Sequence, residues 1–84
     1  MDQEKKQQNL QQLERAITVL NIISEEVEPV GLTYVTARAG LSKPAAQRIL
    51  STLAANNILF KDPDGRYAMG PKVLKWAHSF RKRS

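Results

Sequence analysis

The side chains best suited to bind a charged partner fall within one short stretch, residues 41–55. Built as a helix, this stretch presents on one side short side chains and polar ones with hydrogen-bonding heads: Lys43, Pro44, Gln47, Arg48, Ser51 and Ala55. That side carries no acidic residue, so it can approach a polyanion without repulsion. Its N-terminal end is also the positive end of the helix dipole. The predicted chemistry is hydrogen bonding and charge pairing with a polyanion, and a plain surface helix is the alternative.

The element that must position these side chains is an amphipathic helix over residues 42–56. Ser42 is a favourable N-cap, and Pro44 lies in the first turn, where its missing N–H costs nothing. The other side of the helix is apolar and must enter a core, because it carries Ala46, Ile49, Leu50 and Leu53 at helical spacing.

A shorter helix is predicted immediately before it, over residues 34–39, with Thr33 as its N-cap. Gly40 is placed to end that helix in the left-handed conformation. Only Leu41 then separates Gly40 from Ser42. A helix, a tight glycine turn and a second helix make the helix-turn-helix arrangement.

After Asn57 the pattern changes from helical to extended. Strand, turn and strand signals follow one another at residues 58–61, 62–65 and 66–69. We take the helix over residues 42–56 as a candidate recognition helix, and a hairpin directly after such a helix is a wing. Phe60 can pack against Tyr67 within it. The turn contains two acids, Asp62 and Asp64, which argue against the tip of the hairpin lying on phosphates. Arg66 is the better candidate for a contact with a phosphate backbone.

Two further helices are predicted at the ends of the chain. Residues 1–9 read as a polar, frayed tail. A first helix follows to about Glu26; it could begin near Leu10 or earlier, because glutamine and lysine are good helix formers. Its apolar stripe is Leu10, Leu13, Ala16, Ile17, Leu20, Ile23 and Val27. Val19 and Ile22 fall outside that stripe. The final helix, from Lys72 to about Arg81, carries its own stripe of Val73, Trp76, Ala77 and Phe80.

These surplus apolar groups predict a two-fold dimer. In that dimer Val19 and Ile22 of one chain pack against the final helix of the other, at Val73, Trp76 and Phe80. The alternative is that the final stripe belongs to the core of its own domain. If the polyanionic partner is duplex DNA, the dimer would place two recognition helices on one face of it and require a roughly palindromic site.

Charge and composition restrict the classes of function. Of the 84 residues, 1–28 hold three basic against six acidic residues, a net −3, while 29–84 hold ten against two, a net +8. The basic half contains the candidate recognition helix, which favours nucleic acid as the partner. There is no cysteine, one histidine (His78), and no carboxylate pair or phosphate loop in a supporting context. We therefore expect no enzyme, no cofactor and no metal site.

Several runs together resemble the N-terminal winged-helix domain of the IclR family of bacterial transcription regulators. They are Leu13-Glu14-Arg15-Ala16, Gly31-Leu32-Thr33, Ala39-Gly40-Leu41, Arg48-Ile49-Leu50, Thr52-Leu53, Asp62-Pro63-Asp64-Gly65-Arg66-Tyr67 and Gly70-Pro71-Lys72. The resemblance implies a cytoplasmic operator-binding domain, working as a dimer or tetramer, with a C-terminal domain that senses a small molecule. This chain is then expected to be a fragment, with a winged helix-turn-helix domain at 10–70 and the start of a linker helix with a basic end at 71–84.

The sequence departs from the family pattern on the recognition helix. Lys43-Pro44-Ala45 stands where Lys-Ser-Thr is usual, so two hydroxyl contacts are absent, and Gln47 replaces a common His or Tyr. The base preference should therefore differ.

The fold class predicted is mainly α with a small β-hairpin, and the function is sequence-specific binding of double-stranded DNA. Gln47 and Arg48 are expected to meet bases, and Lys43 and Ser51 phosphates. The full set of predicted DNA contacts is Thr33, Ser42, Lys43, Pro44, Gln47, Arg48, Ser51 and Arg66. A winged-helix module that binds protein instead of DNA remains the alternative.

Overall fold

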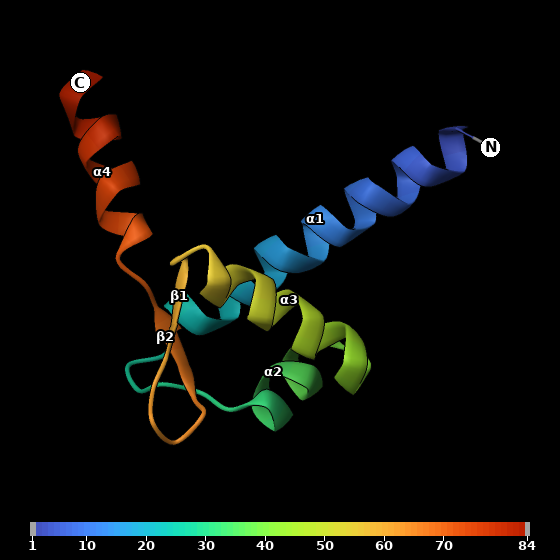
Figure 1. Cartoon of the computed structure of the whole chain (residues 1–84), viewed down its shortest axis with the longest axis horizontal. Helices are drawn as coiled ribbons and strands as arrows, with labels where there is room; N and C mark the ends of the chain where they lie inside the picture. Colours follow the sequence, from blue (N-terminus) through green and yellow to red (C-terminus); the bar gives the residue numbers. More distant parts are fainter. Residues whose placement is uncertain (1, 84) are drawn as a thin grey trace.

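Four helices and one hairpin make up the computed structural model, which describes residues 2–83, with side chains from Leu10 onward. Their order is α1 (Asp2–Ser24), α2 (Leu32–Ala39), α3 (Lys43–Ala55), β1 (Leu59–Lys61), β2 (Tyr67–Met69) and α4 (Lys72–Arg83) (Figure 1). The predicted class, mainly α with a small hairpin in the order of a winged helix-turn-helix, is confirmed.

The turn between α2 and α3 follows from local chemistry. Gly40 adopts φ 66°, and the N–H of Leu41 donates to the carbonyl of Thr36 at 3.2 Å, which closes the end of α2. Ser42 then caps α3, because its Oγ accepts from the N–H of Ala45 at 3.3 Å. Both predicted roles are confirmed.

The predicted start of α2 is wrong by two residues. Gly31 is the N-cap, with extended backbone and no side-chain cap bond, and α2 begins at Leu32. Thr33 therefore lies inside the first turn, where its carbonyl accepts from the hydroxyl of Thr36 at 2.8 Å. Leu32 can begin the helix because it also packs against the core, which local capping rules do not take into account.

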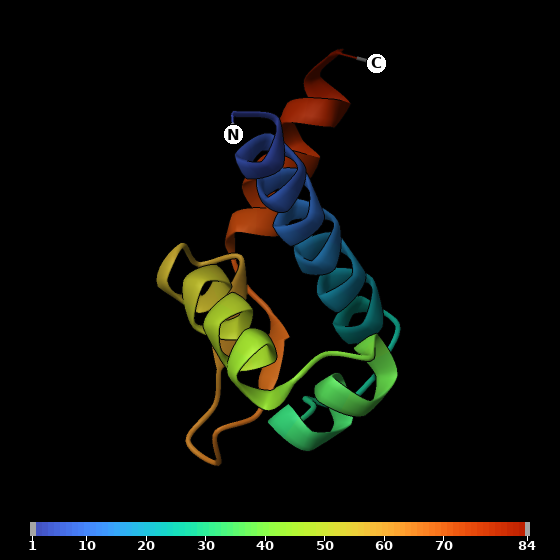
Figure 2. The same cartoon turned by 90° about the vertical axis from the view of Figure 1, so that its right-hand side faces the viewer.

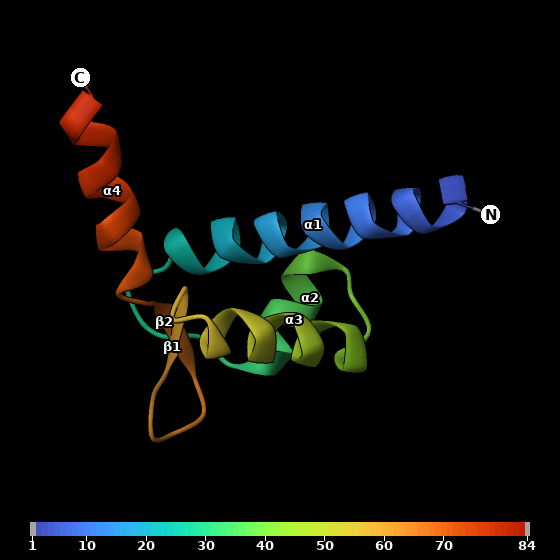
Figure 3. The ribbon, with the colours of Figure 1, turned by 45° about the horizontal axis from the view of Figure 1, so that its top comes forward.

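The core lies where α1, α2, α3 and the hairpin meet. Its fully enclosed side chains come from all four elements: Val19, Val35, Leu50 and Leu59. α1 runs beside α3, and α2 packs against both (Figure 2). α1 lies on one side of this group, and the hairpin tip projects from the other side (Figure 3).

The predicted packing face of α1 is partly right, because Ala16, Leu20 and Ile23 of the predicted stripe do lie in or against the core, and wrong at its edges. Val19 and Ile22, expected outside the core, are 0% and 7% exposed, whereas Leu10 and Leu13 of the predicted stripe are 61% and 57% exposed. The true stripe is Ala16, Val19, Leu20 and Ile23, which has the same helical spacing. The two stripes overlap in the sequence, and the N-terminal half of α1 extends beyond the body of the domain (Figure 3). Val19 and Ile22 are therefore not dimer contacts.

The start of α1 is the earlier of the two that the sequence allows. Its backbone is helical from Asp2, and it ends at Ser24, before the predicted Glu26. Glutamine and lysine are good helix formers, so the polar segment continues the helix without a hydrophobic face of its own. The side chains of residues 1–9, predicted to be a polar tail, lie outside the described residues.

The hairpin register separates the aromatic pair predicted to pack. Lys61 pairs with Tyr67 and Phe60 with Ala68, so Tyr67 points into the core while Phe60 lies on the other face, 55% exposed. The predicted Phe60–Tyr67 contact is therefore wrong, because alternate residues of a strand face opposite sides. Tyr67 also forms a bridge to Val30, with N···O distances of 2.9 and 2.7 Å, which ties the α1–α2 connection to the hairpin.

α4 leaves the domain from a fixed base. The N–H of Gly70 donates to the carbonyl of Ile58 at 2.8 Å, and that of Lys72 to the carbonyl of Asn57 at 3.0 Å. Beyond this base α4 points away from the other elements (Figure 1). None of its residues is buried, and Trp76 is 50% exposed. The alternative that its apolar stripe belongs to the domain's own core is therefore wrong.

Candidate nucleic-acid interface

α3 presents a continuous exposed face opposite its core side. Ala46, Ile49, Leu50 and Leu53 are buried. The predicted contact residues of this helix and its cap are all exposed: Ser42, Lys43, Pro44, Gln47, Arg48 and Ser51. The structure therefore brings these six side chains onto one surface, because every buried position lies on the other side of a regular helix.

The cations of this face are not neutralised by the protein. The two ion pairs formed by the described side chains join Arg38 to Glu26 at 3.8 Å and Arg66 to Asp64 at 3.3 Å. Within residues 10–83, neither Lys43 nor Arg48 pairs with a carboxylate. Because no acid occurs between residues 29 and 61, both charges are available to an anionic partner.

Gln47 and Arg48 lie on opposite flanks of the exposed face, with Pro44 and Ser51 between them at 3.6 residues per turn. The amide of Gln47 donates to the hydroxyl of Ser51 at 3.3 Å, a long bond that leaves the planar head close to the helix surface. Within its own turn, the carbonyl of Arg48 accepts from the hydroxyl of Thr52 at 2.8 Å. Gln47 therefore keeps both a donor and an acceptor for a partner.

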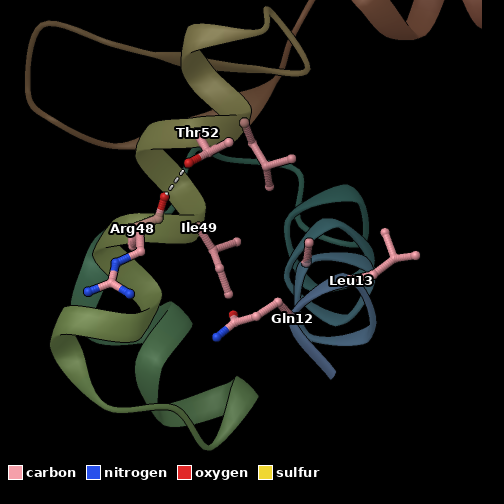
Figure 4. A pocket seen from close by; sticks show the side chains of 7 residues that line it. Gln12, Leu13, Arg48, Ile49 and Thr52 are labelled. Atoms are coloured by element: carbon pink, nitrogen blue, oxygen red, sulfur yellow. Dashed lines mark hydrogen bonds between the residues drawn. The ribbon is translucent and has the colours of Figure 1, made fainter. Parts of the chain in front are cut away.

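A groove of about 350 Å³ opens between α1 and α3. Ile49 and Gln12 point into it from the two helices, whereas the guanidinium of Arg48 points away from it (Figure 4). Sequence reasoning missed the groove, and no local signal could have revealed it, because it depends on how α1 crosses α3.

The turn between β1 and β2, at the tip of the wing, is stabilised by one of its two acidic residues. The carboxylate of Asp62 accepts from the N–H groups of Asp64 and Arg66, each at 2.9 Å, and Gly65 supplies the positive φ, 78°. The other acid, Asp64, accepts from the guanidinium of Arg66 at 3.3 Å. Arg66, predicted to contact phosphate, is thus half-exposed beside the turn and paired within the protein.

A further polar cluster, missed by sequence reasoning, ties the loop that follows α1 to α2. The hydroxyl of Tyr34 donates to the carboxylate of Glu26 and accepts from the guanidinium of Arg38 at 2.7 Å. The hydrogen bond to Glu26 raises the pKa of Tyr34, and partial burial raises it further, against a smaller opposing effect of Arg38. The sequence could have indicated the contact between Tyr34 and Arg38, because the two residues are one helical turn apart. It could not have indicated the contact with Glu26, which depends on the course of the loop between α1 and α2.

The remaining predicted residues lie apart from the face of α3. Thr33 is exposed at the start of α2, and Val73, Trp76 and Phe80 lie along α4. Across residues 2–83 there is no helix long and apolar enough to cross a membrane. Among residues 10–83, whose side chains the structure describes, no group of three side chains is suited to hold a metal ion.

Comparison with known proteins places this geometry in a family. Residues 12–63 match the model of the IclR helix-turn-helix domain. The glycerol operon regulatory protein of Streptomyces griseus is 33% identical over 73 residues, which cover 86% of this chain and 29% of that protein.

Solved structures show the same fold. The Agobacterium tumefaciens repressor BlcR superposes with a TM-score of 0.80 at 22% identity, over 90% of this chain and 30% of that one. The Thermotoga maritima IclR gives a TM-score of 0.81 at 19% identity, over 89% and 30%. The chain thus spans less than a third of the length of these relatives. The family consists of transcription regulators and not of enzymes, as expected, and its helix-turn-helix is the DNA-binding part. This chain belongs to the IclR helix-turn-helix family.

Proposed function

We propose that this domain reads an operator by placing α3 in the major groove of duplex DNA, with the β1–β2 wing beside it. The observation that carries the proposal is the exposed face of α3, which is free of acids and holds two cations that pair with no carboxylate among residues 10–83. A helix fits the major groove, where each base pair shows a distinct pattern of donors and acceptors.

The exposed positions divide into two roles. Gln47 carries a planar amide able to pair with adenine, and Arg48 a guanidinium able to pair with guanine. Lys43 lies in the first turn of α3 beside the cap, where the ammonium and the positive helix end together favour a phosphate. Ser51, Ser42 and Thr33 offer hydroxyls to the backbone, and Pro44 gives a contact without a hydrogen bond.

We further propose that the domain works as a two-fold dimer. Two apolar surfaces support this. One is formed on α1 by Leu10, Leu13 and Ile17, which are 48–61% exposed, and the other on α4 by Trp76 and Phe80 with the half-buried Val73. Surfaces of this kind on a small domain mark interaction sites. A two-fold axis would present two copies of α3 to one face of DNA and so require a roughly palindromic operator.

We also propose that a C-terminal domain beyond α4 senses a small-molecule effector, and that the regulator acts in the cytoplasm, where its operator lies. The support is the family membership of this chain, together with its coverage of less than a third of its relatives.

Selection from a random pool of duplexes tests the proposed reading of bases. The purified domain should enrich one short motif repeated in inverted orientation. Enrichment that yields no motif, with binding that is the same for every sequence, would contradict sequence-specific reading. An absence of duplex binding at low salt would instead favour a protein-binding module.

A further inference from the structure

The two acids at the wing tip have different tasks. Asp62 already uses one carboxylate oxygen to accept from two backbone N–H groups, and its own N–H donates to the carbonyl of Arg66 at 2.8 Å. The turn is therefore closed by Asp62, Gly65 and the backbone. The side chain of Asp64 takes no part in these bonds, is 73% exposed, and contacts the guanidinium of Arg66.

We infer that Asp64 is a counter-charge that holds Arg66 back from DNA, so that the wing contacts a phosphate only when Arg66 exchanges its carboxylate partner. The inference rests on the proposed function, in which the wing lies beside the duplex. Asp64 would then lower the affinity of the wing for the DNA backbone of every sequence alike, without touching a base.

The ion pair is suited to such an exchange. Both side chains are more than half exposed, at 54% for Arg66 and 73% for Asp64, and an exposed ion pair is weak. Duplex DNA offers Arg66 a row of phosphates that releases counterions on contact. The ion pair therefore does not prevent the contact between Arg66 and a phosphate, but it reduces the binding free energy that this contact contributes. A second, separate effect of Asp64 is direct repulsion of the phosphates, which does not depend on Arg66.

A double-mutant cycle separates these two effects. Asp64→Asn, with Asp64→Ala as a second neutral variant, is compared with wild type and again in an Arg66→Ala background, on one non-operator duplex over a range of salt. Asp64→Glu, which keeps the charge, is the matched control. Circular dichroism verifies that each variant keeps its helices.

We expect Asp64→Asn to raise the affinity for the non-operator duplex about two- to fivefold at low salt, the range of an exposed ion pair. The slope of log affinity against log salt should steepen by up to about 0.9, the value for one further phosphate. In the Arg66→Ala background the same change should have a clearly smaller effect, and Asp64→Glu should resemble wild type.

Two results would overturn the inference while leaving the proposed function intact. One is an unchanged affinity in Asp64→Asn and Asp64→Ala, with wild type still binding. The other is an equal gain in both backgrounds, which would mean that Asp64 acts by repulsion alone. A wild-type domain that binds no duplex would instead overturn the proposed function, and this inference with it.

Discussion

At the scale of single residues, Gln47 is one of the two side chains that we propose distinguish bases. It is exposed on one flank of α3 and is held only by a 3.3 Å bond to Ser51. Gln47→Ala removes the amide, so preference at one base position of the operator should relax, at a cost of about 1–3 kcal/mol against the preferred site. Competition binding against operators changed at each position measures this. A selection profile that Gln47→Ala leaves unchanged would assign the reading of bases elsewhere.

Tyr34 makes a second prediction at this scale, on pH. Its pKa is raised above the usual 10.0, mainly by the hydrogen bond to Glu26, so the folded state holds the phenolic proton more tightly than the unfolded chain. The resulting stability is complete below pH 10 and is lost as the pH rises through the raised pKa. Tyr34→Phe should therefore melt below wild type at neutral pH.

The gap between the two melting curves should narrow in the alkaline range, because only wild type loses this contribution there. Thermal melts at several pH values above and below 10 check the prediction. Phe60→Leu, an exposed aromatic change outside the cluster, is the control for general effects. A gap that stays constant through the alkaline range would show that the Tyr34 proton is not linked to folding.

At the scale of elements, the base of α4 depends on Gly70. A Cβ there would lie 2.5 Å from the carbonyl oxygen of Asn57 and 2.9 Å from backbone atoms of Leu59, so the backbone must shift. Gly70→Ala should destabilise the domain by roughly 1–3 kcal/mol, in the range of an overpacked core. Denaturant unfolding measures this loss.

Gly31→Ala is the matched control for Gly70→Ala. Its added Cβ would meet only Arg66 Cγ, at 4.0 Å, which is ordinary contact with a flexible side chain. Its loss of stability should therefore be the smaller of the two. Equal losses at both glycines would contradict the crowding at Gly70 as the cause.

The elements also show which parts of the fold were predictable. The turn, the cap and the buried face of α3 follow from Gly40, Ser42 and the helical spacing, because each depends on neighbours within a few residues. The packing face of α1 was not predictable, since two overlapping stripes compete and only the body of the domain selects one. The Asp64–Arg66 pair and the α1–α3 groove depend on geometry that residue types alone do not determine.

At the scale of the whole molecule, α4 and the N-terminal half of α1 project from the body and carry exposed apolar side chains (Figure 1). We expect wild type to dimerise at high concentration and the double variant Leu13→Ser, Trp76→Ala to remain monomeric, because the variant removes apolar area from both surfaces. Sedimentation measures the difference. Lys75→Ala, an exposed change on α4, should behave as wild type. A wild-type domain that stays monomeric at millimolar concentration would contradict the dimer.

Duplex binding through α3 is tested most directly by measuring how the affinity for DNA depends on salt. The basic charge of residues 29–84 motivates this test. If four to six phosphates are neutralised per domain, log affinity should fall with log salt with a slope of roughly −4 to −5. Lys43→Ala should weaken binding to every sequence alike and reduce that slope by about 0.9, as expected for one lost phosphate contact. An affinity that does not change with salt, or a slope that Lys43→Ala leaves unaltered, would contradict the placement of α3 against the DNA backbone.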